Sequence, residues 1–167
     1  FDMGGTSTDV AHCLGKIEYR SKTEIEGISI VAPMVDIHTV AAGGGSVVNF
    51  DGVQLKVGPA SAGSEPGPAC YKRGGPLTIT DCNLLLGFLN PEYFPKCFGK
   101  DNNQMLDRNI ISVEFEKLMV SSNSRQLQKM NIYQFAEGFI KIANEKMANA
   151  IKKISIDKGH DIRSYSL

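Results

Sequence analysis

Residues 2–9 read Asp2-Met-Gly-Gly-Thr-Ser-Thr-Asp9, in which two glycines and three hydroxyl residues lie between two acids. Paired glycines let a backbone turn tightly and approach a ligand closely, and the N–H groups of such a turn can converge on an anion. Carboxylates repel a phosphate unless a cation lies between them, and Mg²⁺ commonly bridges carboxylates and substrate phosphates. The octet therefore predicts a hairpin turn that holds a metal–nucleotide, although an ordinary glycine-rich turn fits the same residues.

Composition and charge exclude several classes of protein. The 167 residues carry 18 basic and 18 acidic side chains, so no basic field favours nucleic acid or an anionic membrane. No apolar run reaches the length of a membrane span. The four cysteines form no Cys-x-x-Cys pair, which argues against a zinc ribbon or a thioredoxin-type motif. Together with the lack of a signal peptide, these features predict a reduced, cytoplasmic protein.

Hydrophobic patterning predicts strands in the first half of the chain. Residues 10–23 fit an extended pair around a turn, 28–31 fit a further strand, and 34–42 fit an apolar strand that leads into three glycines. Residues 47–57 fit a hairpin that turns at Asp51-Gly52. Residues 58–76 are rich in glycine and proline, which predicts a long, ordered loop of the kind that carries function.

Three helices are expected in the second half. The first is expected over 80–90, with Thr80 as its N-cap and with Leu84, Leu85 and Phe88 facing inward. The second is expected over 112–121, followed by a polar linker as far as Lys129. The third is expected over 132–158, where apolar residues recur at helical spacing. Asn131 and Gln134 predict a capping box at its start, and Gly159 predicts its end.

Several single residues could carry chemistry. Asp36 and His38 share a strand face and could bind a metal or polarise a substrate amide, or they could form a hydrogen-bonded structural pair. Asp81 could act as a base or contact a metal, but a place in the first turn of a helix also explains it. Cys70 has no neighbouring base in the sequence, which argues against a nucleophile. His12 and His160 are interpreted as structural contacts.

Four segments in order, spanning 1–10, 35–46, 57–71 and 74–83, go beyond generic chemistry. They contain Phe1-Asp-Met-Gly-Gly-Thr-Ser-Thr-Asp-Val10, Val35-Asp-Ile-His-Thr-Val-Ala-Ala-Gly-Gly-Gly-Ser46, Pro66-Gly-Pro-Ala-Cys-Tyr71 and Thr80-Asp-Cys-Asn83. In this order they resemble the hydantoinase A / 5-oxoprolinase family, and in particular its eukaryotic-type 5-oxoprolinases. Residues 94–99 and 159–161 fit the same family more loosely.

The resemblance implies an α/β protein with an actin/hexokinase/Hsp70-like (ribonuclease H-like) ATPase fold, in which helices pack on a mixed sheet. It implies ATP-dependent ring opening of a cyclic amide by phosphorylation of the amide oxygen, with 5-oxo-L-proline to L-glutamate as the best single guess. An N-methylhydantoinase, an acetone or acetophenone carboxylase-type subunit, and a non-catalytic nucleotide-binding or scaffold fragment are the alternatives.

The resemblance also assigns roles to residues. ATP and Mg²⁺ are the implied cofactors, with Mn²⁺ or K⁺ as alternatives in the full enzyme, and Asp2 and Asp9 are the implied metal ligands. The implied phosphate contacts are Gly4, Gly5, Thr6, Ser7, Thr8, Gly43, Gly44 and Gly45. The candidate catalytic residues are Asp36, His38 and Asp81.

The resemblance further implies a hydantoinase B-like half, in the same chain or as a subunit, and a homo-oligomer at full length. The chain begins at Phe1, with no strand before the loop, and it holds one of the two phosphate hairpins that this fold uses. We therefore expect residues 1–167 to be a single partial lobe of a longer protein and to be inactive in isolation.

Overall fold

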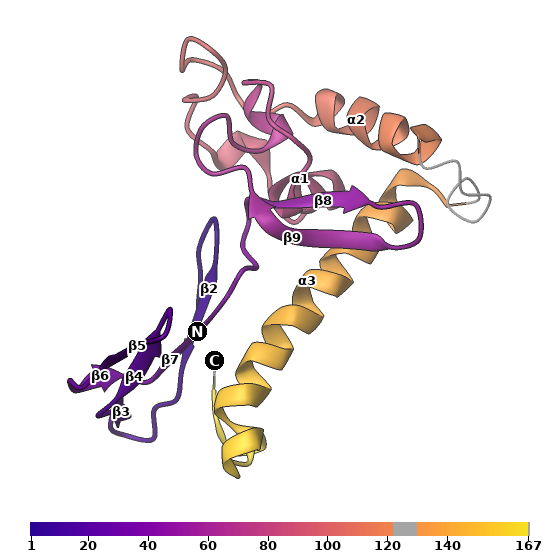
Figure 1. The fold of residues 1–167 in the computed structure, drawn as a ribbon. Helices are drawn as coiled ribbons and strands as arrows, with labels where there is room; N and C mark the ends of the chain where they lie inside the picture. Colours follow the sequence, from indigo (N-terminus) through magenta and orange to yellow (C-terminus); the bar gives the residue numbers. More distant parts are fainter. Residues whose placement is uncertain (122–129, 167) are drawn as a thin grey trace.

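The long helix α3 (Ile132–Ile154) organises the fold in the computed structural model, which describes residues 1–121 and 130–166 (Figure 1). The first half of α3 packs against the hairpin of β8 (Ser46–Phe50) and β9 (Leu55–Ser61) and against helices α1 (Ile79–Leu86) and α2 (Arg108–Ser121). Three fully buried aromatic side chains meet in this main core, namely Phe115, Phe135 and Phe139.

The second half of α3 leaves the main core and runs beside β2 (Thr8–Ala11) and β7 (Ile37–Val40) (Figure 1). A small second core forms there from Val10, Ala150 and Ile154. The helix thus connects the main core to the N-terminal strands, which carry the octet.

The N-terminal strands form small antiparallel sheets. Strands β1 (Asp2–Met3), β2 and β7 pair in the order β1-β2-β7. Strand β3 (Tyr19–Arg20) pairs with β6 (Met34–Val35), and β4 (Thr23–Ile25) pairs with β5 (Ile28–Ile30). Every strand pairing in the described part of the chain is antiparallel, and the strands form small separate sheets. We had expected one mixed sheet with parallel and antiparallel pairs. Parallel pairing needs a long crossover connection, and short turns join several of these strands instead.

Helix α1 begins earlier than predicted and is shorter. Its N-cap is Thr78, two residues before the predicted Thr80, and the Thr78 N–H donates to Asp81 Oδ2 at 2.8 Å. Gly87 ends the helix with a left-handed φ of +83°. Phe88 lies beyond that end and is 71% exposed, so the prediction that it faces inward was wrong. Leu84 and Leu85 are buried as predicted.

The predicted hairpin and the cap of the long helix are confirmed. β8 and β9 turn around Asp51-Gly52, and Asn131 and Gln134 form the capping box that begins α3. The helix ends at Ile154 rather than Lys158, because a 3₁₀ turn (Ile156–Lys158) intervenes before Gly159.

Helix α2 begins four residues before its predicted start. The Asp107 carboxylate accepts hydrogen bonds from the N–H groups of Asn109 and Ile110, which places the cap there. The predicted linker lies over 122–129, outside the described residues.

The glycine- and proline-rich loop begins later than predicted, because β9 continues to Ser61. The rest of the predicted loop, as far as residue 76, contains the 3₁₀ turn Ala69–Tyr71. Further 3₁₀ turns occupy Pro91–Tyr93 and Ile162–Ser164. No helix in the described ranges is long and apolar enough to cross a membrane.

Candidate functional site

The octet folds as the predicted β-hairpin. Asp2 lies opposite Asp9 and Met3 lies opposite Thr8, so residues 4–7 form the turn. The Gly4 N–H donates to the Ser7 carbonyl at 2.9 Å, which closes the turn but removes this N–H from the donors that we expected to face a ligand. Within the described part of the chain, the N–H groups of Gly5 and Thr6 have no acceptor. These two N–H groups remain available to an anion.

The three consecutive glycines pack directly behind this turn. The N–H of Gly44 donates to the Gly4 carbonyl at 3.0 Å, and the N–H of Gly45 donates to the Gly5 carbonyl at 2.6 Å. The Gly43 N–H donates to Ser46 Oγ at 2.9 Å, and a Cβ on Gly43 would lie 2.7 Å from both carbonyl oxygens of the turn. All three N–H groups have partners in the protein, so these glycines support the turn, and their predicted contact with phosphate stays a prediction.

The three hydroxyl residues of the octet have different environments. Thr8 is fully buried, and its hydroxyl donates to the Ala42 carbonyl at 2.6 Å, so it faces the protein and not a phosphate as predicted. Thr6 is exposed, with Oγ1 3.3 Å from Ser61 Oγ. Ser7 is half-buried. Thr6 and Ser7 therefore remain the candidate hydroxyl contacts.

The two acids of the octet lie on one face of the sheet. Directly opposed residues of an antiparallel pair point to the same side, with Cβ atoms about 4.5–5.5 Å apart, and this pairing joins Asp2 to Asp9. Both residues are exposed, and Asp9 Oδ1 accepts a hydrogen bond from Thr39 Oγ1 at 2.5 Å. Like charges directly opposite each other destabilise a strand pair. Two exposed carboxylates on one face of a hairpin whose turn carries unpaired N–H groups are compatible with Mg²⁺, which prefers oxygen ligands.

Asp36 and His38 do not form the predicted pair. The Asp36 carboxylate forms ion pairs with Arg20 and Lys158, one on each oxygen. His38 lies on β7 and borders a cavity of about 350 Å³ together with Lys146 and Lys153. Burial, with help from the charge of Lys153, lowers the pKa of His38. The two residues thus have separate partners, and a catalytic role for either one stays a prediction.

Asp81 is a structural residue rather than the predicted catalytic acid or base. Its carboxylate is fully buried and accepts hydrogen bonds from the N–H groups of Ala69 at 3.1 Å, Cys70 at 2.8 Å and Thr78 at 2.8 Å. The Thr78 hydroxyl also donates to it, at 2.9 Å. Burial raises the pKa of Asp81, and the donors oppose that rise. Asp81 therefore fastens the glycine- and proline-rich loop to the start of α1, away from solvent.

Cys70 shares this buried environment, and burial strongly raises the pKa of its thiol. This agrees with the expectation that it is not a nucleophile.

Comparison with known proteins places these features in a family. The family description hydantoinase/oxoprolinase matches residues 1–167. The chain belongs to the hydantoinase/oxoprolinase family. It is 48% identical over 171 residues to a 5-oxoprolinase of Dictyostelium discoideum and 46% identical over 168 residues to a 5-oxoprolinase of Saccharomyces cerevisiae. Each alignment covers 100% of this chain but only 14% and 13% of those proteins, respectively.

A solved structure extends the comparison to the fold. The nucleotide-free structure of acetone carboxylase, an enzyme of ATP-dependent acetone carboxylation, superposes with a TM-score of 0.79 at 27% identity. The superposition covers 98% of this chain and 22% of that one. This likeness confirms the expected fold, which is α/β and of the actin/hexokinase-like ATPase class.

Sequence reasoning missed two polar residues at the edge of the site. Thr39 bonds Asp9, and Ser61 lies beside Thr6. Thr39 is opposite Asp9 only because β7 pairs with β2, and Ser61 reaches the turn only because β9 pairs with β8. The one signal that could have suggested Thr39 is its place next to His38 on a strand already predicted to border the site.

Alanine substitutions at Gly5 and Gly43 test two different roles. Gly5→Ala tests whether a ligand approaches the turn closely, and Gly43→Ala tests whether Gly43 supports the turn from behind. A Cβ on Gly5 meets nothing within 4 Å, and the φ of Gly5 is outside the left-handed region. We expect Gly5→Ala to fold normally but to lower the ATP turnover of the full-length protein by about 100-fold, since small displacements of reacting groups cost that much. Gly43→Ala is expected to lower stability by about 1–3 kcal/mol through overpacking. Melting curves and ATPase rates of both variants measure the difference, and normal turnover in a folded Gly5→Ala protein contradicts the role.

Proposed function

We propose that the protein containing this chain is an ATP-dependent enzyme that opens a cyclic amide, with 5-oxo-L-proline as substrate and L-glutamate as product. The observation that carries the proposal is the exposed pair Asp2 and Asp9 beside the free N–H groups of Gly5 and Thr6. Similarity to two 5-oxoprolinases supports the choice of substrate.

The reaction suits a site of this kind. An amide is a poor electrophile, and ATP supplies the phosphoryl group that makes the amide carbon open to attack by water. Phosphoryl transfer depends on positioning and charge neutralisation more than on a covalent nucleophile. The site therefore needs donors for phosphate oxygens and ligands for a cation, and it does not need a reactive cysteine or serine.

Each residue of the hairpin has a part in this proposal. The N–H groups of Gly5 and Thr6 donate to phosphate oxygens, and the Thr6 and Ser7 hydroxyls lie at the same turn. Asp2 and Asp9 hold Mg²⁺, directly or through water. Thr39 orients the Asp9 carboxylate through its hydrogen bond, and the glycines at 43–45 hold the turn in place.

Further features of the whole protein follow from the same proposal. The chain spans 13–14% of the 5-oxoprolinases that it matches. We propose that the remainder contains the second phosphate hairpin and a hydantoinase B-like half. We also propose that the full-length protein is a cytoplasmic homo-oligomer, with residues 1–167 as one partial lobe of its ATPase domain.

A carboxylase is the second candidate, because the solved structure that superposes on 98% of the chain is an acetone carboxylase. Both reactions use ATP, so the hairpin serves either one. Only the site for the second substrate distinguishes them.

The deciding experiment uses the full-length protein with Mg²⁺ and four reaction mixtures. These contain 5-oxoproline with ATP, 5-oxoproline without ATP, N-methylhydantoin with ATP, and acetone and bicarbonate with ATP. We expect glutamate to form only in the first mixture, together with ADP and phosphate. ATP consumption only with acetone and bicarbonate would establish the carboxylase instead. ATP left intact in every mixture would contradict both and indicate a nucleotide-binding scaffold.

A further inference from the structure

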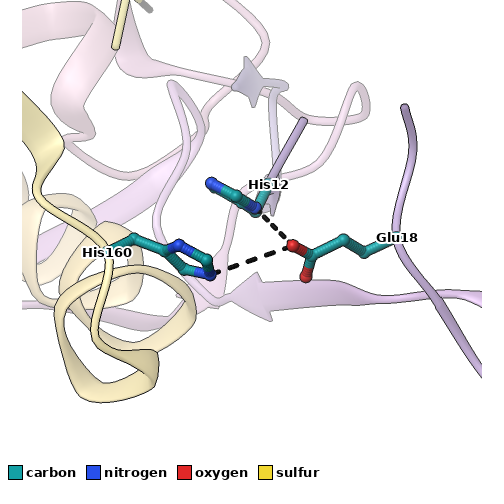
Figure 2. Close-up of side chains that lie close together, drawn as sticks. All are labelled: His12, Glu18 and His160. Atoms are coloured by element: carbon teal, nitrogen blue, oxygen red, sulfur yellow. Dashed lines mark hydrogen bonds and ion pairs between the residues drawn. The ribbon is translucent and has the colours of Figure 1, made fainter. Parts of the chain in front are cut away.

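Two histidines and a glutamate from separate segments meet outside the nucleotide site (Figure 2). His12 follows β2, Glu18 precedes β3, and His160 lies between the two 3₁₀ turns that follow α3. Glu18 Oε1 lies 2.6 Å from His12 Nδ1 and 3.9 Å from His160 Nε2. The three ligand atoms all lie within 4.8 Å of one another. Figure 2 shows a dashed line from one nitrogen of each imidazole to the same carboxylate oxygen.

One ligand of the cluster is buried and two are partly open to solvent. His12 is only 7% exposed, and its Nδ1 is the nitrogen that lies beside Glu18. The side chains of Glu18 and His160 are 36% and 31% exposed, which leaves an approach from solvent. Imidazole nitrogens and one carboxylate are a donor set that zinc uses.

We propose that His12, Glu18 and His160 form a three-ligand site for a divalent transition metal of the Zn²⁺ class, with one coordination position open. Ligand atoms of tetrahedral zinc lie about 3.3 Å apart, given metal–ligand bonds of about 2.0–2.2 Å. The separations of 2.6 and 3.9 Å lie on either side of that value. The site is distinct from the oxygen-only pair Asp2 and Asp9.

One movement accompanies metal binding. The rings of His12 and His160 are stacked, with centroids 4.0 Å apart and planes 20° apart. A metal bound by an imidazole nitrogen lies in the plane of that ring, so two nearly parallel rings cannot both point at one ion. His160 is the ring that turns, because it follows Gly159 and is partly exposed, whereas His12 is buried. Binding thus ties the chain after α3 to the segment between β2 and β3.

Lys158 distinguishes a metal site from a purely structural cluster. Its ammonium lies 3.7 Å from Glu18 Oε2 and also pairs with Asp36. A cation at this place competes with a metal for the Glu18 charge. Lys158→Ala is therefore expected to tighten zinc binding several-fold if the cluster is a metal site. If the cluster only holds the chain together, the loss of an ion pair does not create zinc affinity.

The test uses the full-length protein, freed of metal by a chelator and kept in excess Mg²⁺ so that oxygen-ligand sites are filled. Zn²⁺ is titrated by calorimetry, and Co²⁺ is titrated with visible absorption as a report of coordination geometry. We expect His160→Ala and His12→Ala each to lose one equivalent of bound metal, or to bind it at least about 100-fold more weakly. His38→Ala is the matched control, since His38 is the third histidine of the chain and lies outside the cluster.

The outcomes separate clearly. The proposal is supported if the His160→Ala protein loses one equivalent of bound zinc. In that case the His38→Ala protein binds zinc normally, and the Lys158→Ala protein binds it more tightly. His160→Ala is the decisive variant because its side chain is partly exposed and its removal leaves the buried cores intact. Unchanged zinc stoichiometry and affinity in a folded His160→Ala protein overturns the proposal, as does an unaltered protein that binds neither metal.

Discussion

Asp9→Asn in the full-length protein is expected to lower ATP turnover by about 100-fold, the scale on which one lost transition-state contact acts. Asp9 is exposed, lies opposite Asp2, and is oriented by Thr39. An amide in its place keeps the size and the hydrogen-bond acceptor but removes the charge that we propose binds Mg²⁺. ATPase rates at saturating Mg²⁺ and matched folded fraction measure the effect.

The same substitution is expected to have little effect on folding, because exposed positions usually change stability by no more than about 0.5 kcal/mol. Without Mg²⁺ we expect Asp9→Asn to raise the stability slightly, because the substitution removes the repulsion between two opposed carboxylates. A metal-free Asp9→Asn protein should therefore melt at or slightly above the temperature of the unaltered protein.

Asp51→Asn is the matched control for Asp9→Asn. Asp51 also lies at the turn of a hairpin, where it accepts N–H bonds from Val53 and Gln54 and pairs with Lys56. These contacts hold the pKa of Asp51 well below its usual range. Asp51→Asn should leave ATP turnover unchanged. Equal ATPase rates for Asp9→Asn and the unaltered protein would remove Asp9 from the metal site.

Asp81→Ala is expected to destabilise the loop–helix junction by about 3–5 kcal/mol, because several buried donors lose their acceptor together. The donors are the N–H groups of Ala69, Cys70 and Thr78 and the Thr78 hydroxyl. Asp81 is fully buried, so bulk solvent does not reach these donors directly.

Hydrogen–deuterium exchange of the full-length protein localises this effect. Every 1.4 kcal/mol is about a tenfold change, so amides in 66–82 should exchange roughly 100-fold faster or more in the Asp81→Ala protein. Asp107→Ala is the control, because Asp107 also caps a helix but is half-buried and should cost only about 1 kcal/mol. Unchanged exchange at Ala69 and Cys70 in the Asp81→Ala protein contradicts the structural role.

Sequence reasoning succeeded where structure is set by neighbours along the chain. The hairpin of the octet, the Asp51-Gly52 turn and the Asn131–Gln134 capping box each depend on residues a few positions apart. Glycine geometry, side-chain caps and the helical spacing of apolar residues act over that range. These elements could therefore be predicted without tertiary contacts.

Sequence reasoning could not identify hydrogen-bond partners that lie far along the chain. Thr8 was expected to face a phosphate, but the Ala42 carbonyl accepts its hydroxyl. Gly44 and Gly45 were expected to contact a nucleotide, but the carbonyls of Gly4 and Gly5 accept their N–H groups. A donor cannot be assigned to a ligand until every acceptor that the fold brings near it is known.

By itself, the sequence determined the family, the long helix, and the turn between Asp2 and Asp9. Each of these features depends on residues that are close together along the chain. Only the tertiary structure decided which polar groups of the octet can reach a ligand. Strand pairing places Asp2 opposite Asp9, and the Thr8 hydroxyl is buried because it donates to the Ala42 carbonyl. It also brought His160 to His12 and Glu18, because α3 returns the end of the chain to the N-terminal strands. Burial and pairing are properties of folded neighbours, and spacing along a chain does not specify them.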